Sequence, residues 1–284
     1  MICYIVILLL TVLYSTLYWY LSDSLVLLGV WIILGFLSGA FTFLLYVLLV
    51  IFLSPYSKPN NKLKQKVIHP LVVFVNSILK IKIKVIGREN IPNETHVVYG
   101  NHKSMLDITI LYEVYNEVIT AVAKNSLVKV PILHRLMKAL AVVPIDREND
   151  REGVKNMLKA IDNVKNGINY IIFPEGGVKT REKETMVALR AGAYKLATKP
   201  KATISPISII GSSKLSKNCP KRKTKVTVVI HKPITYEEYK DYNTTELGMK
   251  VGTIINDGVL TSKINTKPLS EIEAKDFIEV EEHA

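Results

Sequence analysis

One short segment combines a histidine and an aspartate at a spacing that can support acid–base chemistry. It reads NHKSMLD over residues 101–107, so His102 precedes Asp107 by five positions. A carboxylate that holds one ring nitrogen of a histidine leaves the other nitrogen free to take a proton from a hydroxyl group. The segment therefore predicts a general base, His102, and an orienting carboxylate, Asp107.

The spacing places a condition on the local structure. On a continuous helix five residues correspond to about 140° of rotation, which is too far for the two side chains to meet. If Ser104 is the N-cap, Asp107 sits at N3, as in a capping box, and His102 lies in the preceding loop within its reach. The alternative is that Ser104 and Asp107 only cap a helix while His102 bonds to the backbone. This segment alone leaves both interpretations open.

A second candidate, Arg147, follows a predicted strand in the sequence PIDR over residues 144–147. Ligands of open α/β sheets gather at the carboxyl ends of strands, and the planar guanidinium group suits a phosphate. The competing interpretation is a surface ion pair with Glu148 or Asp150.

A third segment, FPEGG over residues 173–177, also follows a predicted strand. Gly176 and Gly177 free the backbone to approach a phosphate or a small headgroup, and Glu175 can bind a polyol hydroxyl. The alternative interpretation is that this segment is an ordinary turn without a ligand. Lys179 and Arg181 follow and supply positive charge.

The elements that must position these residues alternate between strand and helix patterns, which favours an α/β fold with a mixed, largely parallel sheet flanked by helices. A fourth segment, ISPISI over residues 204–209, reads as a buried strand whose Pro206 favours a sheet edge or a bulge. Strands are expected at 83–86, 96–99, 119–123, 141–145, 170–173, 204–209 and 226–231. Helices are expected at 60–79, 105–115, 132–140, 151–165, 183–199 and 236–256.

The N-terminal part has a different character. Asp23 is the only charged side chain in residues 1–56, and it separates uncharged runs at 2–21 and 25–53. Each run is long enough to cross a bilayer, for which about 20 residues are needed. A buried soluble hairpin, or one that dips into one leaflet, remains an alternative. The lysines of residues 58–66 predict that the following domain is cytoplasmic. We therefore expect a membrane hairpin at 1–56, a catalytic domain at 57–265 and an acidic tail at 266–284.

The formal charge of +12 suits an anionic partner such as lipid headgroups or an acidic carrier. No zinc-spaced Cys/His set or aromatic RNA-binding motif supports nucleic acid as a partner. Cys3 and Cys219 are the only cysteines, so neither a disulfide framework nor a metal site is expected.

In order and spacing, the four segments resemble the glycerolipid acyltransferases, specifically the 1-acylglycerol-3-phosphate acyltransferases. NHxxxxD, IDR, FPEG and the strand at 204–209 fit the four blocks of that family, and the similarity covers roughly residues 85–230. The resemblance implies acyl transfer from acyl-CoA or acyl-carrier protein to lysophosphatidate, a membrane lipid, without a cofactor or metal. An N-terminal hydrophobic hairpin is also usual in the family.

The resemblance also implies roles for single residues. His102 would deprotonate the 2-hydroxyl of the acceptor, and Asp107 would orient His102. Arg147, with Lys124, would hold the phosphate, while Glu175 and Gly176 would shape the glycerol pocket.

Two departures affect the acceptor. Gly177 and Val178 replace the family's usual Thr-Arg, and Ala141 and Pro144 replace a glycine and an aromatic residue. Arg181 or Lys179 can substitute for the missing arginine, a hypothesis under which Arg181→Ala raises the KM for a phosphorylated acceptor. Another lysophospholipid or glycerol 3-phosphate remains an alternative acceptor. A non-catalytic protein that binds anionic membranes is the alternative from a different class.

Overall fold

A seven-stranded mixed sheet is the centre of the computed structural model, which describes residues 2–22, 24, 27–58, 61–145 and 150–264. In these residues the strand order is β1-β7-β6-β2-β5-β3-β4. The strands are β1 (Ile81–Ile86), β2 (His96–Gly100), β3 (Ile119–Lys124), β4 (Val143–Ile145), β5 (Asn169–Ile172), β6 (Thr203–Ile210) and β7 (Thr224–Ile230). Each lies within two residues of a predicted strand at both ends.

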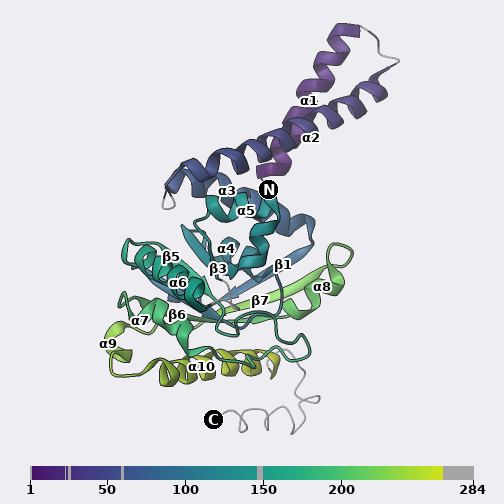
Figure 1. Cartoon of the computed structure of the whole chain (residues 1–284). Helices are drawn as coiled ribbons and strands as arrows, with labels where there is room; N and C mark the ends of the chain where they lie inside the picture. The colour runs from purple at the N-terminus through teal and green to yellow at the C-terminus, as the bar shows by residue number, and fades with distance from the viewer. Residues whose placement is uncertain (1, 23, 25–26, 59–60, 146–149, 265–284) are drawn as a thin grey trace.

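Helices surround this sheet and extend away from it (Figure 1). The α-helices are α1 (Ile2–Ser22), α2 (Leu28–Leu53), α3 (Lys62–Ile78), α4 (Asp107–Tyr115), α5 (Pro131–Ala139), α6 (Asp150–Lys165), α7 (Lys195–Thr198), α8 (Leu215–Asn218), α9 (Tyr236–Tyr239) and α10 (Thr244–Ile264). Short 3₁₀ turns are η1 (Ser54–Tyr56), η2 (Arg88–Asn90), η3 (Asn125–Lys129), η4 (Ala191–Tyr194) and η5 (Ser212–Lys214). The helix predicted at 236–256 is thus two helices, α9 and α10. The predicted acidic tail lies outside the described residues.

The strand directions gather several loops at one edge. From β6 through β2, β5 and β3 to β4 all neighbours are parallel, whereas β7 is antiparallel to β6 and parallel to β1. The predicted mixed, largely parallel sheet is therefore confirmed. Because β2, β5 and β3 run the same way, the segments that follow Gly100, Ile172 and Lys124 all leave the sheet at the carboxyl-terminal end of its strands.

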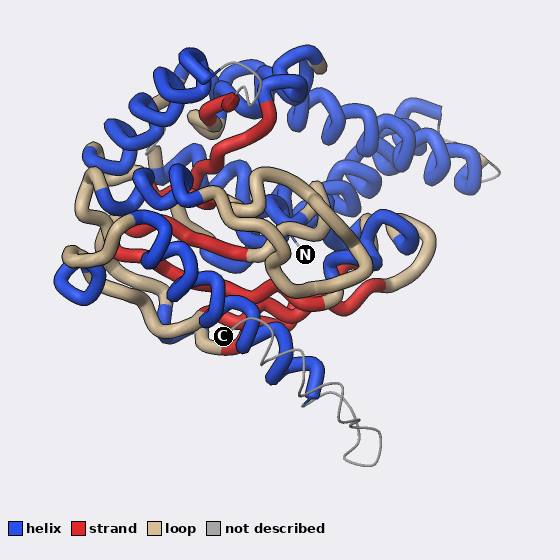
Figure 2. Tube along the Cα trace, turned by 60° about the horizontal axis from the view of Figure 1, so that its bottom comes forward, coloured by secondary structure: helices blue, strands red, loops and turns tan. Residues whose placement is uncertain are grey.

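Both faces of the sheet are buried, which explains the continuous apolar runs of its central strands. Val97 and Tyr99 of β2 pack toward α6, α7 and α10, while Val98 packs toward α3 and α4. The tube view in Figure 2 shows the strands enclosed by these helices, with long loops crossing one end. The loop that follows β2 begins at residue 101.

The helix predicted at 183–199 is wrong over its first half. Residues 183–190 carry no helix, and only η4 and α7 follow. Side chains from other elements occupy their backbone groups: Asn101 donates to the Glu184 carbonyl, and Asn256 both accepts from the Met186 N–H and donates to its carbonyl. Tertiary contacts thus override the local helical pattern.

Of the two positions expected for Pro206, a sheet edge or a bulge, the edge is wrong, because β6 lies between β7 and β2. The proline falls in a gap on its β7 side. The antiparallel ladder with β7 begins at Ile207, and the next contact on that side is the bridge between Ile204 and Ile234. Pro206 still accepts a hydrogen bond from the His231 N–H, at 3.0 Å. A missing N–H is tolerated in this gap, even in a central strand.

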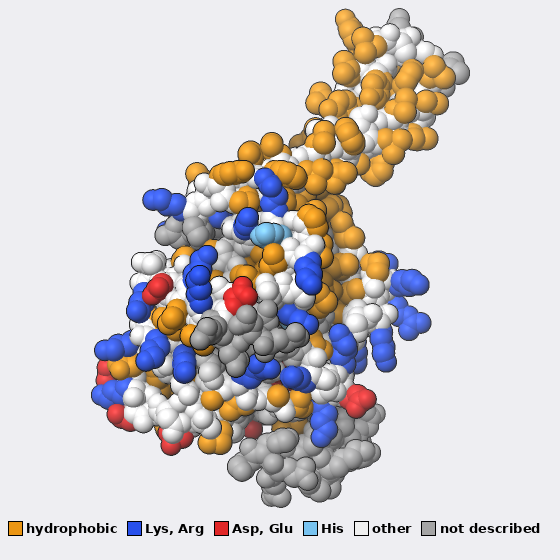
Figure 3. All heavy atoms as spheres, viewed as in Figure 1, with side chains coloured by type: hydrophobic (Ala, Val, Ile, Leu, Met, Phe, Trp, Pro, Cys, Tyr) orange, Lys and Arg blue, Asp and Glu red, His pale blue; other side chains and the backbone are white. Residues whose placement is uncertain are grey.

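Helices α1 and α2 form a hairpin that projects from the domain and exposes apolar side chains over its whole length (Figure 3). Both helices are long and apolar enough to cross a membrane, by length and composition. This supports membrane association. Charged side chains lie on the domain instead, where lysine and arginine are numerous (Figure 3).

The hairpin helices approach closely at Gly35 and Gly39, which are buried on α2. A Cβ at Gly35 would overlap Ser15 Oγ and lie 2.8 Å from the Thr11 carbonyl oxygen of α1. A side chain at this position must therefore push the helices apart.

Gly35→Leu is accordingly expected to destabilise the hairpin by about 1–3 kcal/mol, the usual cost of overpacking. The chain's two tryptophans, Trp19 and Trp31, both lie in the hairpin, so tryptophan fluorescence, excited selectively over tyrosine, reports its unfolding alone. Gly29→Leu is the matched control, because nothing lies within 4 Å of a Cβ there. Equal midpoints for the two variants would contradict the close crossing.

A buried lysine connects the end of the hairpin to the domain. Lys64 Nζ on α3 donates to the Ser57 carbonyl at 3.4 Å and to the Ala139 carbonyl at the end of α5 at 2.5 Å. Burial lowers the pKa of Lys64. Lys64 is thus a structural residue, while Lys58, Lys62 and Lys66 of the predicted basic flank are exposed.

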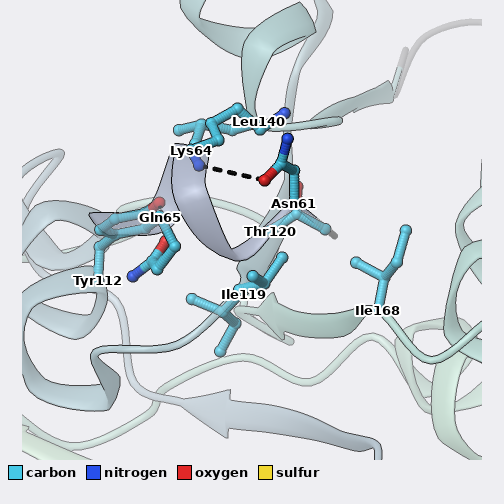
Figure 4. A pocket seen from close by; sticks show the side chains of 9 residues that line it. Asn61, Lys64, Gln65, Tyr112, Ile119, Thr120, Leu140 and Ile168 are labelled. Atoms are coloured by element: carbon cyan, nitrogen blue, oxygen red, sulfur yellow. Dashed lines mark hydrogen bonds between the residues drawn. The ribbon is translucent and has the colours of Figure 1, made fainter. Parts of the chain in front are cut away.

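Lys64 also lines a cavity of about 10 Å³, enough for one water molecule (Figure 4). Gln65 Nε2 and Thr120 Oγ1 are buried beside it without a partner among the described residues. The lining residues Ile119 and Ile168 lie at or before the beginnings of β3 and β5. The cavity therefore lies at the amino-terminal ends of the strands, opposite to the loop that begins at residue 101.

Candidate active site

His102 and Asp107 meet directly. The His102 Nδ1–H donates to Asp107 Oδ2 at 2.9 Å, and Asp107 is fully buried at the start of α4. A carboxylate can only accept, so Nδ1 carries the hydrogen and Nε2 keeps its lone pair. The arrangement leaves one basic nitrogen on a side chain that is 17% exposed.

The contact is made by a different local geometry from the predicted cap. Helix α4 begins at Asp107, so Ser104 is not its N-cap and the expected helix start at residue 105 is wrong. Instead the Asp107 carboxylate accepts from the backbone N–H groups of Lys103 and Ser104, each at 2.9 Å. The aspartate closes a turn around the histidine, which fixes the carboxylate and the imidazole together.

The face of the imidazole is covered by Phe173, the first residue after β5. The two rings stack with centroids 4.1 Å apart and an interplanar angle of 8°. The stacking restricts χ1 and χ2 of His102 and covers one face of the ring. An aromatic face also stabilises the imidazolium formed when the base takes a proton.

Beneath the histidine lies a buried ion pair. Lys103 Nζ donates to both oxygens of Glu175, at 3.2 and 3.0 Å, and both side chains are 0% exposed. Glu175 Oε1 also accepts from the His102 N–H at 2.8 Å, and Oε2 accepts from the Val187 N–H at 3.3 Å. This corrects the expectation that Glu175 contacts a substrate hydroxyl, since its carboxylate is closed to solvent and already bonded.

The two glycines after Glu175 adopt conformations that other residues rarely adopt. Gly176 has a φ of +72° and Gly177 a φ of +142°. The turn they make is covered by Arg190: a Cβ at Gly176 would lie 2.5 Å from its Nε. This geometry is consistent with the prediction that the two glycines let the backbone approach a phosphate or a small headgroup. In the structure, however, it is the Arg190 side chain that lies against the turn.

The remaining predicted residues are placed as follows. Lys124 ends β3 and is exposed at the edge from which the residue 101 loop leaves. Arg181 and Lys179 are exposed in the loop between β5 and η4. Arg147 lies outside the described residues. Among the described residues no group of three or more His, Cys, Asp or Glu side chains can hold a metal ion.

Three contributors were not predicted: Lys103, Phe173 and Asn101. Asn101 is fully buried and bonds to the Glu184 and Ile209 carbonyls and to the Ile209 N–H, which holds the loop against β6. The only sequence signal for Lys103 is that Glu175 stands alone among apolar and glycine residues and needs a cation if buried. No pattern in the sequence indicates which face of His102 a phenylalanine covers.

Comparison with known proteins identifies the class. Residues 82–210 match the family model described as Acyltransferase. This part of the chain is thus similar to the acyltransferase family, in agreement with the resemblance of its motifs.

Among relatives, a 1-acyl-sn-glycerol-3-phosphate acyltransferase of Saccharomyces cerevisiae is 32% identical over 49% of this chain and 46% of its own length. A probable enzyme of the same name from Mycoplasma genitalium is 28% identical over 74% of this chain and 82% of its own. The crystal structure of the lysophosphatidate acyltransferase PlsC of Thermotoga maritima has a TM-score of 0.63, 24% identity, and coverage of 79% and 90%; it shows the same fold.

The chain spans about half the length of the first curated relatives that it matches, 46% of the yeast protein and 44% of a chloroplast enzyme from Arabidopsis thaliana.

Proposed function

We propose that this protein is an enzyme that transfers a fatty acyl group from an acyl thioester to the 2-hydroxyl of 1-acylglycerol 3-phosphate, making phosphatidate for phospholipid synthesis. The single observation that carries the proposal is the bond between His102 Nδ1 and buried Asp107, which leaves Nε2 as the nitrogen that can take a proton. The relatives named above are acyltransferases for this acceptor.

The proposed reaction is direct transfer. Nε2 of His102 takes the hydroxyl proton as the acceptor oxygen attacks the thioester carbonyl, and Asp107 stabilises the resulting imidazolium. The carbon–sulfur bond breaks when the tetrahedral intermediate collapses, and the proton passes from His102 to the leaving thiolate. No acyl-enzyme, metal or cofactor is required.

The proposed setting is a membrane surface with the domain on its cytoplasmic face. Exposed Lys58, Lys62 and Lys66 directly follow the hairpin, as positive residues do on the cytoplasmic side. The net charge of +12 suits acyl-CoA or acyl-carrier protein, both of which are anionic.

An acceptor panel tests the proposal. Membranes with the wild-type protein are supplied with lysophosphatidate, other lysophospholipids or glycerol 3-phosphate, each with acyl-CoA and with acyl-carrier protein. Phosphatidate is expected as the main product from lysophosphatidate. Preference for another acceptor would correct the substrate while keeping the chemistry, and the absence of transfer to every acceptor would leave the non-catalytic membrane binder.

A further inference from the structure

Arg190 is fixed against the turn that carries Glu175. Its backbone N–H donates to the Pro174 carbonyl at 2.9 Å, so the far end of the loop returns to its beginning. Its side chain crosses Gly176, where a Cβ would lie 2.5 Å from Nε and 2.8 Å from Cδ. Only a glycine allows this approach without movement of the arginine, and the guanidinium stem is therefore held by the shape of the turn.

The same turn also contacts the proposed base. Glu175, next to Gly176, accepts the His102 backbone N–H, and Phe173 stacks on the His102 ring. The Arg190 guanidinium, which packs against Gly176, thus lies on the same segment that positions His102.

Arg190 is also an available cation. It is exposed, and within the part of the chain that the structure describes no carboxylate forms an ion pair with it. Lys103, the other cation at this turn, is buried and committed to Glu175. Arg181 is also exposed, and among the described residues no hydrogen bond joins its side chain to the turn.

We propose that Arg190 binds the phosphate of the acceptor lipid. This rests on the proposed function and assigns its anion contact to Arg190 in place of Arg181. A guanidinium offers a rigid fork of N–H donors to phosphate oxygens, and the stem across Gly176 limits the entropy lost when they bind. The phosphate is the same in substrate and transition state, so this contact acts on KM and leaves kcat nearly unchanged.

The test compares Arg190→Gln and Arg190→Lys with Arg181→Gln, a matched arginine of the same loop. Arg190→Gln is expected to raise the KM for lysophosphatidate about 10- to 100-fold, as for loss of one charge-assisted contact, with kcat within about twofold. Arg190→Lys keeps the charge and should show a smaller rise, and Arg181→Gln should raise the KM less than Arg190→Gln does. Arg222→Gln, at an exposed arginine after α8, is the control that should match the wild type. With 1-monoacylglycerol, which lacks the phosphate, Arg190→Gln and wild type should react at equal rates.

An unchanged KM in Arg190→Gln, an equal loss with both acceptors, or a larger effect of Arg181→Gln would overturn the assignment. If the wild type acylates no acceptor, the proposed function fails, and calorimetric binding of glycerol 3-phosphate to the full-length protein decides the anion site separately. Weaker binding by Arg190→Gln than by wild type supports the site, and equal or absent binding rejects it.

Discussion

Replacing His102 with alanine is expected to lower the rate of acyl transfer to lysophosphatidate by about 10²- to 10⁴-fold, the range for a positioned general base. The acceptor hydroxyl then has no proton acceptor at the Nε2 position, while the Asp107 turn keeps its bonds to the Lys103 and Ser104 N–H groups. The variant should therefore fold. The measurement is the initial rate of phosphatidate formation at equal protein levels in membranes.

His134→Ala is the control for loss of a histidine, since His134 belongs to α5 and is not part of the residue 101–107 turn. Asp107→Asn should also slow transfer, because an amide can donate to Nδ1 and so place the hydrogen on Nε2. Wild-type rates in His102→Ala would remove the general-base assignment, whatever the behaviour of the other variants.

Replacing Lys103 with methionine is expected to destabilise the domain by about 3–5 kcal/mol, because it leaves the Glu175 charge buried and unpaired. The loss should be visible as a lower urea midpoint, followed by circular dichroism on protein in detergent.

The double variant Lys103→Met, Glu175→Gln provides the comparison. It removes both charges, while the glutamine oxygen still accepts the His102 N–H that Glu175 accepts now. Most of the lost stability should therefore return. A double variant that is no more stable than Lys103→Met would show that the ion pair is not the cause.

The elements could be predicted because local pattern and burial agree in them. The central strands bury both faces and are rich in β-branched residues, as in β6, so their positions follow from composition. The helix predicted over residues 183–190 is absent for the opposite reason, because local pattern and tertiary contacts disagree there. Its backbone groups are taken by Asn101, Asn256 and Glu175, which are distant in sequence, and no local pattern encodes those bonds.

The site divides in the same way. His102 and Asp107 are five positions apart, so their contact could be predicted from the sequence. The turn that brings them together could not. Lys103 and Glu175 are 72 positions apart, and their pairing depends on β2 and β5 being neighbours. The Glu175 carboxylate, which the sequence suggested as a group that binds substrate, is thus bonded to Lys103 of the protein instead.

The bonds of Lys64 tie the exit of the hairpin and the end of α5 to one ammonium group, so the anchor and the domain move together. With the hairpin in a bilayer, His102 is then kept at a constant height above the lipid. Under the proposed function, a lipid acceptor would reach it by lateral diffusion, in two dimensions, while the thioester would arrive from the three-dimensional solution. Turnover at such a site depends on the mole fraction of acceptor in the surface, not on its amount per volume.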